Sequence, residues 1–432
     1  MLLSVQGLHV LANMSNLTFE CYCTSIHNSI QCNATQTRAE AMHLALQTVR
    51  EAAGESVFLI GCGCPIGSAV GYINGMRISA DTGPSWRPTF PLPWWDWSTL
   101  PCLFAMIRNS LTRMSMGHRW WHNDPDCILL GSSTSLTINE VKSAASIIAM
   151  SGGMFLLSDD LSELSPERVD IATKIFPITG ATAVPLDVHC AIDILPTMLR
   201  IHCSDQKDND NDMNVDNFVT RARVKKRSKK RNCIHMAHGL GSWCALSLSN
   251  WDDVERTVHA PFASFFSQDE AFHMNQDSHL GYHVFSFWNS NYIWFPGQPS
   301  SASPISTQTV SKKLGPHETE IFHIKAVSES QPQYIGSDLH FSCGFEVDIF
   351  DMNRNSLRVK IKTSLQRSGH IYVFIPNYTS QIKASVNTIP FSVDIIARVS
   401  LTNEKFGHVL KIPVWVQVDG SDSDGIIYLQ FS

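Results

Sequence analysis

The stretch GCGCPIGSAVGYINGMRISADTGPSW, residues 61–86, decides the predicted fold. A short apolar segment within it ends at Arg77, and Asp81 follows four residues later, directly before a Thr-Gly-Pro turn. An apolar strand that runs into charged residues and then a turn is typical of α/β barrels, which present their chemistry at the carboxyl ends of the strands. We therefore expect an α/β layer here, with Arg77 and Asp81 at its functional rim.

Short apolar segments alternate with capped helices between residues 37 and 199. Thr37 with Glu40, and Thr137 with Glu140, have the spacing of a capping box, which marks the start of a helix. Strands are predicted at 57–60, 76–78, 127–130 and 154–157, with helices beginning at Thr37, near Thr99, at Thr137 and at Ser165. Because a (β/α)8 barrel has eight such strands, the sequence predicts a partial TIM barrel, roughly its second half.

The pattern changes to a period of two in the C-terminal part of the chain. Apolar residues alternate with polar ones in several segments, which are 339–350, 357–362, 370–375, 396–400 and 413–418. Repeated short strands of this kind predict an antiparallel β-sandwich. The fold class is therefore α/β plus all-β.

This organisation divides the chain into four predicted parts. They are a divergent N-terminal segment over 1–36, the partial barrel over 37–203, a charged disordered insert over 204–232 and the β-sandwich domain over 233–432. The insert is acidic in its first half and basic in its second, a composition that is typical of a solvated loop.

Composition excludes several classes of protein. The chain of 432 residues carries a net charge of -6, which argues against nucleic-acid binding. It has no apolar run of the roughly 18 residues that a membrane span needs, and its first residues lack the basic start of a signal peptide. We therefore expect a soluble protein without a membrane partner, in a compartment that the sequence leaves open. The 12 cysteines show no zinc-site spacing, so free thiols are expected and no metal.

Four motifs occur in an order that resembles a known family. They are GCGCPIGS (61–68), GMRISADTGPSW (75–86), HRWWHNDPD (118–126) and MSGGMFLLSDD (150–160). Together they resemble the C-terminal half of a family 36 glycoside hydrolase, the alpha-galactosidase or melibiase family. The resemblance covers residues 37–200 well and the C-terminal part loosely. It implies a retaining enzyme on a (β/α)8 barrel that is followed by a small β-sandwich.

The resemblance also implies roles for individual residues. Asp81 matches the general acid/base, and Arg77 matches the arginine that binds the sugar. Residues matched to substrate binding are Cys62 and Gly63 near the sugar 2-hydroxyl, Trp86 beside the acid, and Asp124 and Asp126 of the Asn-Asp-Pro-Asp motif. From the residues alone, a structural ion pair between Arg77 and Asp81 is an alternative, and Asp124 and Asp126 could equally cap a turn. Trp94, Trp95 and Trp97 are further residues that could stack on a sugar.

The nucleophile motif of the family is missing from this chain. Where the family has Lys-x-Asp, the sequence reads LTFEC over 17–21, so Thr18 stands in the place of the lysine. Glu20 is the carboxylate available there, and Glu serves as nucleophile in other retaining glycosidases. The first half of the barrel is also missing, so we expect a truncated domain whose activity is open.

Three functions stay open at this stage. The first is hydrolysis of alpha-galactosides, either oligosaccharides or glycoconjugates, by retaining double displacement. The second is galactosyl transfer, as in the related raffinose and stachyose synthases, and the third is glycan binding by a non-catalytic pseudoenzyme. No cofactor is expected, because two carboxylates suffice for this chemistry. The oligomeric state is not predicted.

Overall fold

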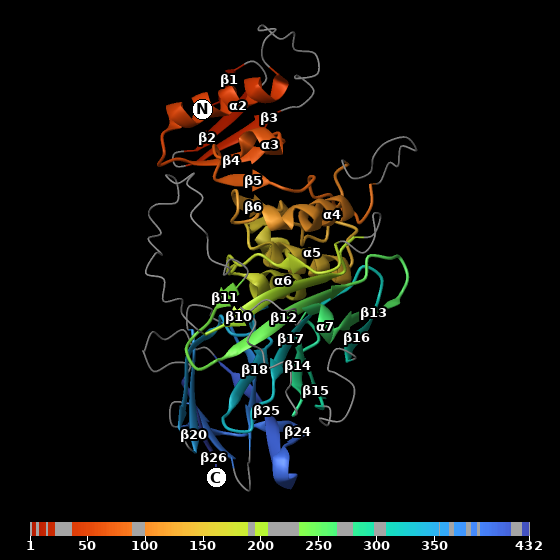
Figure 1. Ribbon diagram of the computed structural model, residues 1–432, viewed down its shortest axis with the longest axis vertical. Coiled ribbons are helices and arrows are strands. Elements are labelled where there is room, and N and C mark those ends of the chain that lie inside the picture. The colour runs from red at the N-terminus through yellow and green to blue at the C-terminus, as the bar shows by residue number, and fades with distance from the viewer. Residues whose placement is uncertain are drawn as a thin grey trace.

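The computed structural model describes most of the chain, and the helices and strands below lie within those residues. They are 2–5, 8–13, 16–21, 37–88, 100–188, 195–205, 233–265, 280–297, 308–353, 355–362, 367–376, 382–386, 389–415 and 426–431. The elements stack in layers along the long axis, with an N-terminal sheet at one end and the antiparallel C-terminal sheets at the other (Figure 1).

A six-stranded sheet forms the N-terminal layer, in the order β1-β2-β3-β4-β5-β6. β3 to β6 run parallel to one another, whereas β1 and β2 join the edge as an antiparallel meander. The strands are β1 (Leu2–Val5), β2 (Leu8–Asn13), β3 (Asn16–Cys21), β4 (Phe58–Cys62), β5 (Gly75–Arg77) and β6 (His122–Asp124).

Helices connect the parallel strands, as the capping signals predict. Helix α2 (Arg38–Ala53) begins at Thr37, whose side chain accepts a hydrogen bond from the Glu40 amide while the Glu40 carboxylate accepts from the Thr37 amide. This reciprocal capping box is confirmed, and so is the one at Thr137. The remaining helices of this part are α3 (Ile66–Ala69), α4 (Leu103–Arg113), α5 (Ile138–Ser151) and α6 (Pro166–Ile175), with short 3-10 turns η2 (Met114–Met116) and η3 (Leu161–Glu163).

Two features of this layer differ from the sequence expectation. Within the predicted divergent N-terminal segment, residues 1–36, β3 lies parallel to β4 and extends the sheet, a pairing that the sequence does not predict. Two predicted strands shorten to β7 (Cys127–Ile128) and β8 (Leu156–Leu157), which pair in a sheet of their own. Both the addition of β3 and the short lengths of β7 and β8 depend on which strands pair. The sequence does not predict this, because the paired strands are distant in sequence. A β-rich architecture with parallel βα units is confirmed, and the partial barrel stays a proposal.

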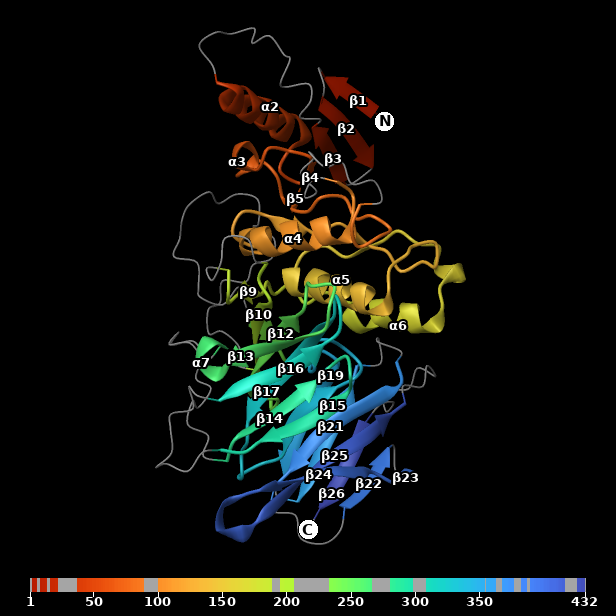
Figure 2. The same ribbon diagram turned by 90° about the vertical axis from the view of Figure 1, so that its right-hand side faces the viewer.

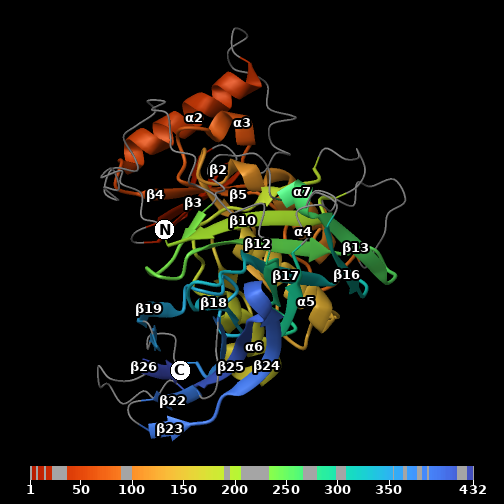
Figure 3. The ribbon, with the colours of Figure 1, turned by 60° about the horizontal axis from the view of Figure 1, so that its bottom comes forward.

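Sheets that are antiparallel except for the parallel pair β10–β11 make up the C-terminal part, and Figure 3 shows β10, β12 and β17 side by side. The central sheet has the order β11-β10-β12-β17-β14-β15, with β9 paired to β10. Its strands are β9 (Val184–Pro185), β10 (Met198–Ser204), β11 (Cys233–His235), β12 (Ser242–Ser249), β14 (Tyr282–Ser286), β15 (Asn291–Phe295) and β17 (Thr319–Ala326). Because β10 ends at Ser204, this sheet begins before residue 233, where the C-terminal domain is predicted to start. The predicted disordered insert lies outside the described residues from 206 to 232.

Two further antiparallel sheets, which correspond to the predicted β-sandwich, share one hydrophobic core, and a two-stranded ribbon flanks the central sheet. The ribbon pairs β13 (Arg256–Pro261) with β16 (Thr309–Leu314), next to the short α7 (Phe262–Phe265). One sandwich sheet contains β18 (Gln333–Ser337), β21 (Gly369–Ile375), β25 (Phe406–Val414) and β24 (Asp394–Ser400). The other contains β19 (Val347–Asn353), β20 (Ser356–Ile361), β26 (Ile426–Phe431), β22 (Ile382–Val386) and β23 (Ile389–Phe391), and η7 (Thr402–Glu404) precedes β25.

One continuous hydrophobic core joins the helical layer to the antiparallel sheets. It runs from Trp86 and α4 through α5 to residues as late as Leu429. Helix α5 lies between the two parts (Figure 2), and its Ser143 hydroxyl bonds the Thr319 hydroxyl at 2.8 Å. Among the described residues, no helix is both long and apolar enough to cross a membrane.

This shared core predicts that α4 to α6 unfold cooperatively with the antiparallel sheets, whereas the N-terminal sheet packs on a separate cluster around Leu59 and Met76. Ile147 on α5 is fully buried, so Ile147→Ala should destabilise the protein by about 2–5 kcal/mol through lost burial and the cavity left behind. Urea unfolding followed by tryptophan fluorescence and by far-UV circular dichroism should give one coincident transition, shifted equally in both signals. Leu44→Ala, at a half-exposed position on α2, is the control and should cost less than about 1 kcal/mol. Two separate transitions, of which only one shifts, would show independent parts.

Candidate active site

The parallel register places four predicted residues in one row at the carboxyl ends of the strands. Glu20 on β3 pairs with Cys62 on β4, and Arg77 on β5 pairs with Asp124 on β6. Since Gly61 pairs with Met76, the residues that follow them, Cys62 and Arg77, stand next to each other in the same row. Neighbouring strands are about 4.8 Å apart, so the whole row spans about 15 Å. Of Glu20 only the backbone position is described.

Arg77 is the centre of this row. Its guanidinium lies 3.0 Å from Asp124 Oδ2, 3.2 Å from Asp126 Oδ1 and 3.3 Å from Asp81 Oδ1. Burial alone would lower the pKa of Arg77, but the carboxylates of Asp124 and Asp126, with Cys62 next, outweigh burial and raise that pKa above its ordinary value. Arg77 therefore provides a fixed positive charge that three carboxyl groups share.

Asp124 and Asp126 act as the frame of the site. Asp124 is buried, and its second carboxylate oxygen accepts the Asp126 amide at 2.9 Å. Asp126 accepts the amides of Cys127 and Thr82, each at 2.7 Å. Asp126 itself has φ of 77°, a left-handed conformation that Asp and Asn tolerate better than most residues. The structure thus shows the turn-forming role together with ion pairs to Arg77, whereas substrate binding by Asp124 and Asp126 stays a prediction.

Asp81 is the accessible carboxyl group of the cluster. Its side chain is 72% exposed, whereas that of Arg77 is 17% exposed. The adjacent Thr82 fixes its backbone, since the Thr82 hydroxyl also donates to the Cys127 carbonyl at 3.0 Å. Asp81 is thus held on a fixed loop with its carboxyl group open to an incoming molecule.

Cys62 and Gly63 lie where the predicted sugar-binding loop leaves β4. Cys62 is half-buried and close enough to Arg77 to interact electrostatically with it. Gly63 is exposed and has φ of 58°, a conformation that glycine adopts without the strain of a side chain. These positions bring a thiol and an exposed turn beside the guanidinium.

Trp86 does not join this cluster. It is 7% exposed, and its ring stacks on His317 with 3.9 Å between ring centroids and on Trp251 at 6.4 Å. The prediction that Trp86 contacts substrate rested on its closeness to Asp81 in sequence. The chain bends over residues 84–87 and Trp86 instead enters the core between the two parts of the protein. Trp94, Trp95 and Trp97 lie outside the described residues.

Sequence reasoning missed two residues that support the site. Thr82 carries the two hydrogen bonds that fix the Asp81 loop, and Arg113 at the end of α4 donates to the Ile78 carbonyl at 2.8 Å. The role of Thr82 could have been predicted, because this threonine directly follows the candidate acid Asp81. Nothing in the sequence links Arg113 to residue 78, because helix packing brings them together.

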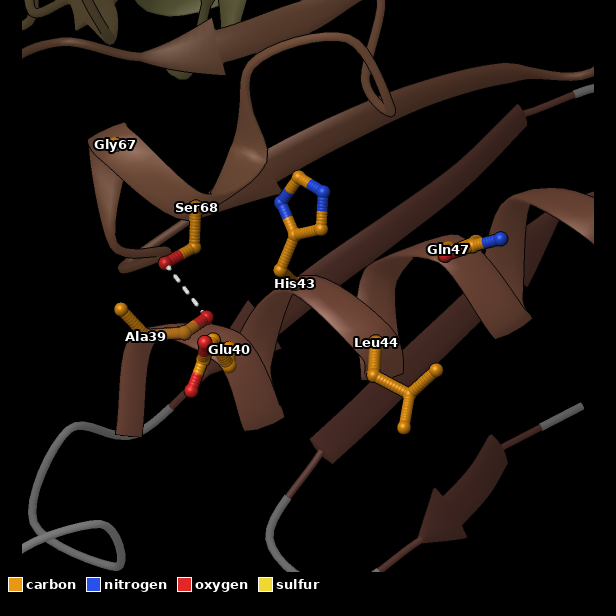
Figure 4. A pocket seen from close by; sticks show the side chains of 7 residues that line it. All are labelled: Ala39, Glu40, His43, Leu44, Gln47, Gly67 and Ser68. Atoms are coloured by element: carbon orange, nitrogen blue, oxygen red, sulfur yellow. Dashed lines mark hydrogen bonds between the residues drawn. The ribbon is translucent and has the colours of Figure 1, made fainter. Parts of the chain in front are cut away.

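A shallow surface groove lies elsewhere, between α2 and α3 (Figure 4). The Ser68 hydroxyl crosses it to the Ala39 carbonyl at 3.4 Å, and Glu40 is occupied by the helix cap. His43 bonds the Tyr72 hydroxyl at 2.8 Å. The groove therefore lies on the helices, and its polar groups are already engaged. Within the described ranges, no cluster of three or more His, Cys, Asp or Glu side chains is arranged to hold a metal ion.

No protein-family model matches the chain. Among solved structures it is similar to an alpha-galactosidase of Saccharomyces cerevisiae, with 13% identity and a TM-score of 0.45 over 72% of each chain. It is also similar to an alpha-galactosidase of Thermus thermophilus in complex with stachyose, with 27% identity and a TM-score of 0.30. That match covers 32% of this chain and 30% of the Thermus chain. Since both TM-scores lie below 0.5, these likenesses do not by themselves assign a fold or an activity.

The Arg77 cluster predicts a large effect on stability. Arg77→Ala would leave the buried Asp124 and Asp126 without their counter-charge, which should cost about 3–5 kcal/mol in the free energy of unfolding. Arg77→Lys should cost less, because it keeps the charge but not the forked geometry. The control is Arg358→Ala, which breaks an exposed pair with Asp351 at 3.8 Å and should cost less than about 1 kcal/mol. Equal losses for the two alanine variants would contradict the central role of Arg77.

A second prediction concerns acid stability at the junction where Trp86 lies. Burial would raise the pKa of Glu140, but hydrogen bonds from His317 and Thr137 outweigh it and hold that pKa below its ordinary value. Ionised Glu140 therefore stabilises the fold above about pH 4.3, and this contribution disappears as the pH falls further. Glu140→Gln should flatten the loss of thermal stability between about pH 5 and pH 3. Glu163→Gln, at an exposed position, should leave the profile unchanged.

Proposed function

We propose that this protein is an alpha-galactosidase-like glycoside hydrolase, which cleaves alpha-galactosides by a retaining double displacement. The observation that carries the proposal is the row formed by Glu20, Cys62, Arg77 and Asp124 at the carboxyl ends of parallel strands. Three of the four ordered motifs that resemble family 36 contribute Cys62, Arg77, Asp124 and the adjacent Asp81, whereas Glu20 comes from the segment 17–21, where the family's nucleophile motif is missing. Motif and geometry therefore support the same site independently.

Each residue has a proposed role in the reaction. The Glu20 carboxylate attacks the anomeric carbon while Asp81 donates a proton to the leaving oxygen, which breaks the glycosidic bond. Asp81 then takes a proton from water, whose oxygen attacks the same carbon and releases Glu20. Arg77, Cys62 and Gly63 would bind the sugar hydroxyls. The transition state of this cleavage resembles a positively charged oxocarbenium ion. The carboxylates around Arg77 would stabilise that charge.

The finer fold proposal is that the α/β layer is the second half of a (β/α)8 barrel. Parallel strands connected by helices and a row of polar residues at their carboxyl ends support it. In such a half, the face opposite the helices lacks part of its cover. Phe58 and Ile60 fit this, since both are only half-buried although Leu59 between them is 1% exposed.

Glycan binding without turnover is the second candidate. The exposure of Asp81 favours it, because a general acid works best when water is excluded around it. Arg77, Asp124 and Asp126 would still bind sugar hydroxyls in such a protein. Galactosyl transfer uses the same residues as hydrolysis, and access of the acceptor sugar decides between the two.

Hydrolysis of an aryl alpha-galactoside by the purified 432-residue chain tests the proposal. Turnover should fall by on the order of 100-fold or more in Asp81→Asn, because general acid–base catalysis contributes that much. Asp351→Asn is the matched control, since Asp351 is an exposed aspartate on β19 with a weak pair to Arg358. Galactoside binding by calorimetry with no turnover in the wild type would favour the binding protein instead. If the folded protein neither binds nor cleaves galactosides, both the hydrolase and the glycan-binding proposals are wrong.

Azide separates the two catalytic roles. In Glu20→Gly, azide can take the place of the nucleophile and attack the activated alpha-galactoside directly, which gives beta-galactosyl azide. In Asp81→Gly, azide attacks the glycosyl-enzyme without needing a general base, which gives alpha-galactosyl azide. NMR of the products should show these opposite anomers. The same anomer from both variants, or no rescue of Glu20→Gly, would remove Glu20 from the proposed role.

A further inference from the structure

The junction between the two parts of the protein contains a histidine with carboxylates on both sides. His317 lies in the turn between β16 and β17, with φ of 55°. Its Nδ1 is 2.8 Å from Glu140 Oε1 on α5, and its Nε2 is 2.9 Å from Asp253 Oδ1. An ionised carboxylate can only accept a hydrogen bond, so both contacts are hydrogen bonds at the same time only when both ring nitrogens carry a proton. The described charged groups facing this ring are Glu140 and Asp253, with Arg87 paired to Asp253 at 3.4 Å.

Trp86 lies flat against this ring. The interplanar angle between Trp86 and His317 is 15°, and their centroids are 3.9 Å apart. A cation over the face of an indole is attracted by the ring electrons, and more strongly when both are desolvated. The Trp86 indole N–H is buried and has no hydrogen-bond partner among the described residues. The orientation of this indole therefore depends on its stacking on His317 and not on a hydrogen bond.

The segment that carries Trp86 leads back to the candidate acid. Between Asp81 and Trp86 the chain is held by the Thr82 amide on Asp126 and by the Pro84 carbonyl, which accepts the Ser135 amide at 2.8 Å. Its far end is held by the Trp86 carbonyl, which accepts the Phe104 amide at 3.0 Å, and by the stack on His317. Residues 82–86 thus form a short bridge with the Arg77 cluster at one end and His317 at the other.

We infer that His317, which belongs to the antiparallel part, is a positioning residue for Asp81 and acts through Trp86 and the bridge 82–86. The role of Asp81 in this statement rests on the proposed function, whereas the mechanical link does not. The antiparallel sheets thereby take part in the site without contacting the sugar. Loss of the stack leaves the far end of the bridge held by its backbone hydrogen bonds to residues 103 and 104 alone. A shift of about 1 Å at a reacting group can cost on the order of 100-fold in rate.

Amide hydrogen exchange on the full chain tests the link without needing activity. In His317→Ala, peptides covering 78–88 should exchange roughly tenfold faster, while α2 stays protected. The matched control is Val373→Ala in the sandwich core, which destabilises the protein away from the bridge. It should not single out residues 78–88. Unchanged protection of 78–88 in His317→Ala, or the same pattern in both variants, would overturn the inference. If His317→Ala does not fold, Trp86→Phe serves instead, because a smaller ring reduces the overlap.

Kinetics with an aryl alpha-galactoside then tests the effect on Asp81. His317→Ala should lower kcat by on the order of 10-fold and leave KM within about twofold, because sugar contacts are unchanged. His317→Arg should recover most of kcat, since a guanidinium can donate to both carboxylates and stack on the indole. Equal kcat values for wild type and His317→Ala would overturn the positioning role. An inactive wild type would instead refute the proposed hydrolase, and the exchange experiment would still decide the link.

Discussion

One guanidinium holds together the carboxyl ends of β5 and β6 and the loops that follow them. Arg77 bonds Asp124 from the next strand, Asp126 from the turn beyond it and Asp81 from its own loop. Asp124 and Asp126 accept hydrogen bonds from backbone amides, whereas Asp81 is exposed. Arg77 therefore connects the two buried carboxylates to the exposed one. Because two of the carboxylates are buried, the cluster depends on this single cation.

The strand register aligns this cluster with Glu20 and Cys62. Parallel strands end at one edge of a sheet, and here that edge carries Glu20, Cys62, Arg77 and Asp124 in one row. The bridge 82–86 then connects this edge to His317, which lies far along the chain in the turn between β16 and β17. The helical layer and the antiparallel sheets are therefore joined both by a shared core and by a path to the site.

Local signals in the sequence predicted local structure well. The capping boxes at Thr37 and Thr137 are confirmed because both partners of each bond lie three residues apart. The pairing of β3 with β4 was not predicted, because the two strands are distant in sequence and no local pattern encodes their contact. The motifs brought Arg77, Asp81, Asp124 and Asp126 to one place, whereas Trp86 was misplaced. Its partner His317 is distant in sequence, and a bend over residues 84–87 separates the direction of Trp86 from that of Asp81.

The central claim is that Glu20 and Asp81 form one catalytic site at the edge of the parallel sheet. Its most direct test is to trap the glycosyl-enzyme with a slow fluorinated alpha-galactoside and to map the labelled peptide by mass spectrometry. We expect one fluorogalactosyl group per chain, on the peptide that contains Glu20, and its loss in Glu20→Gln. A label on another peptide, or no label on folded protein that binds galactosides, would contradict the claim.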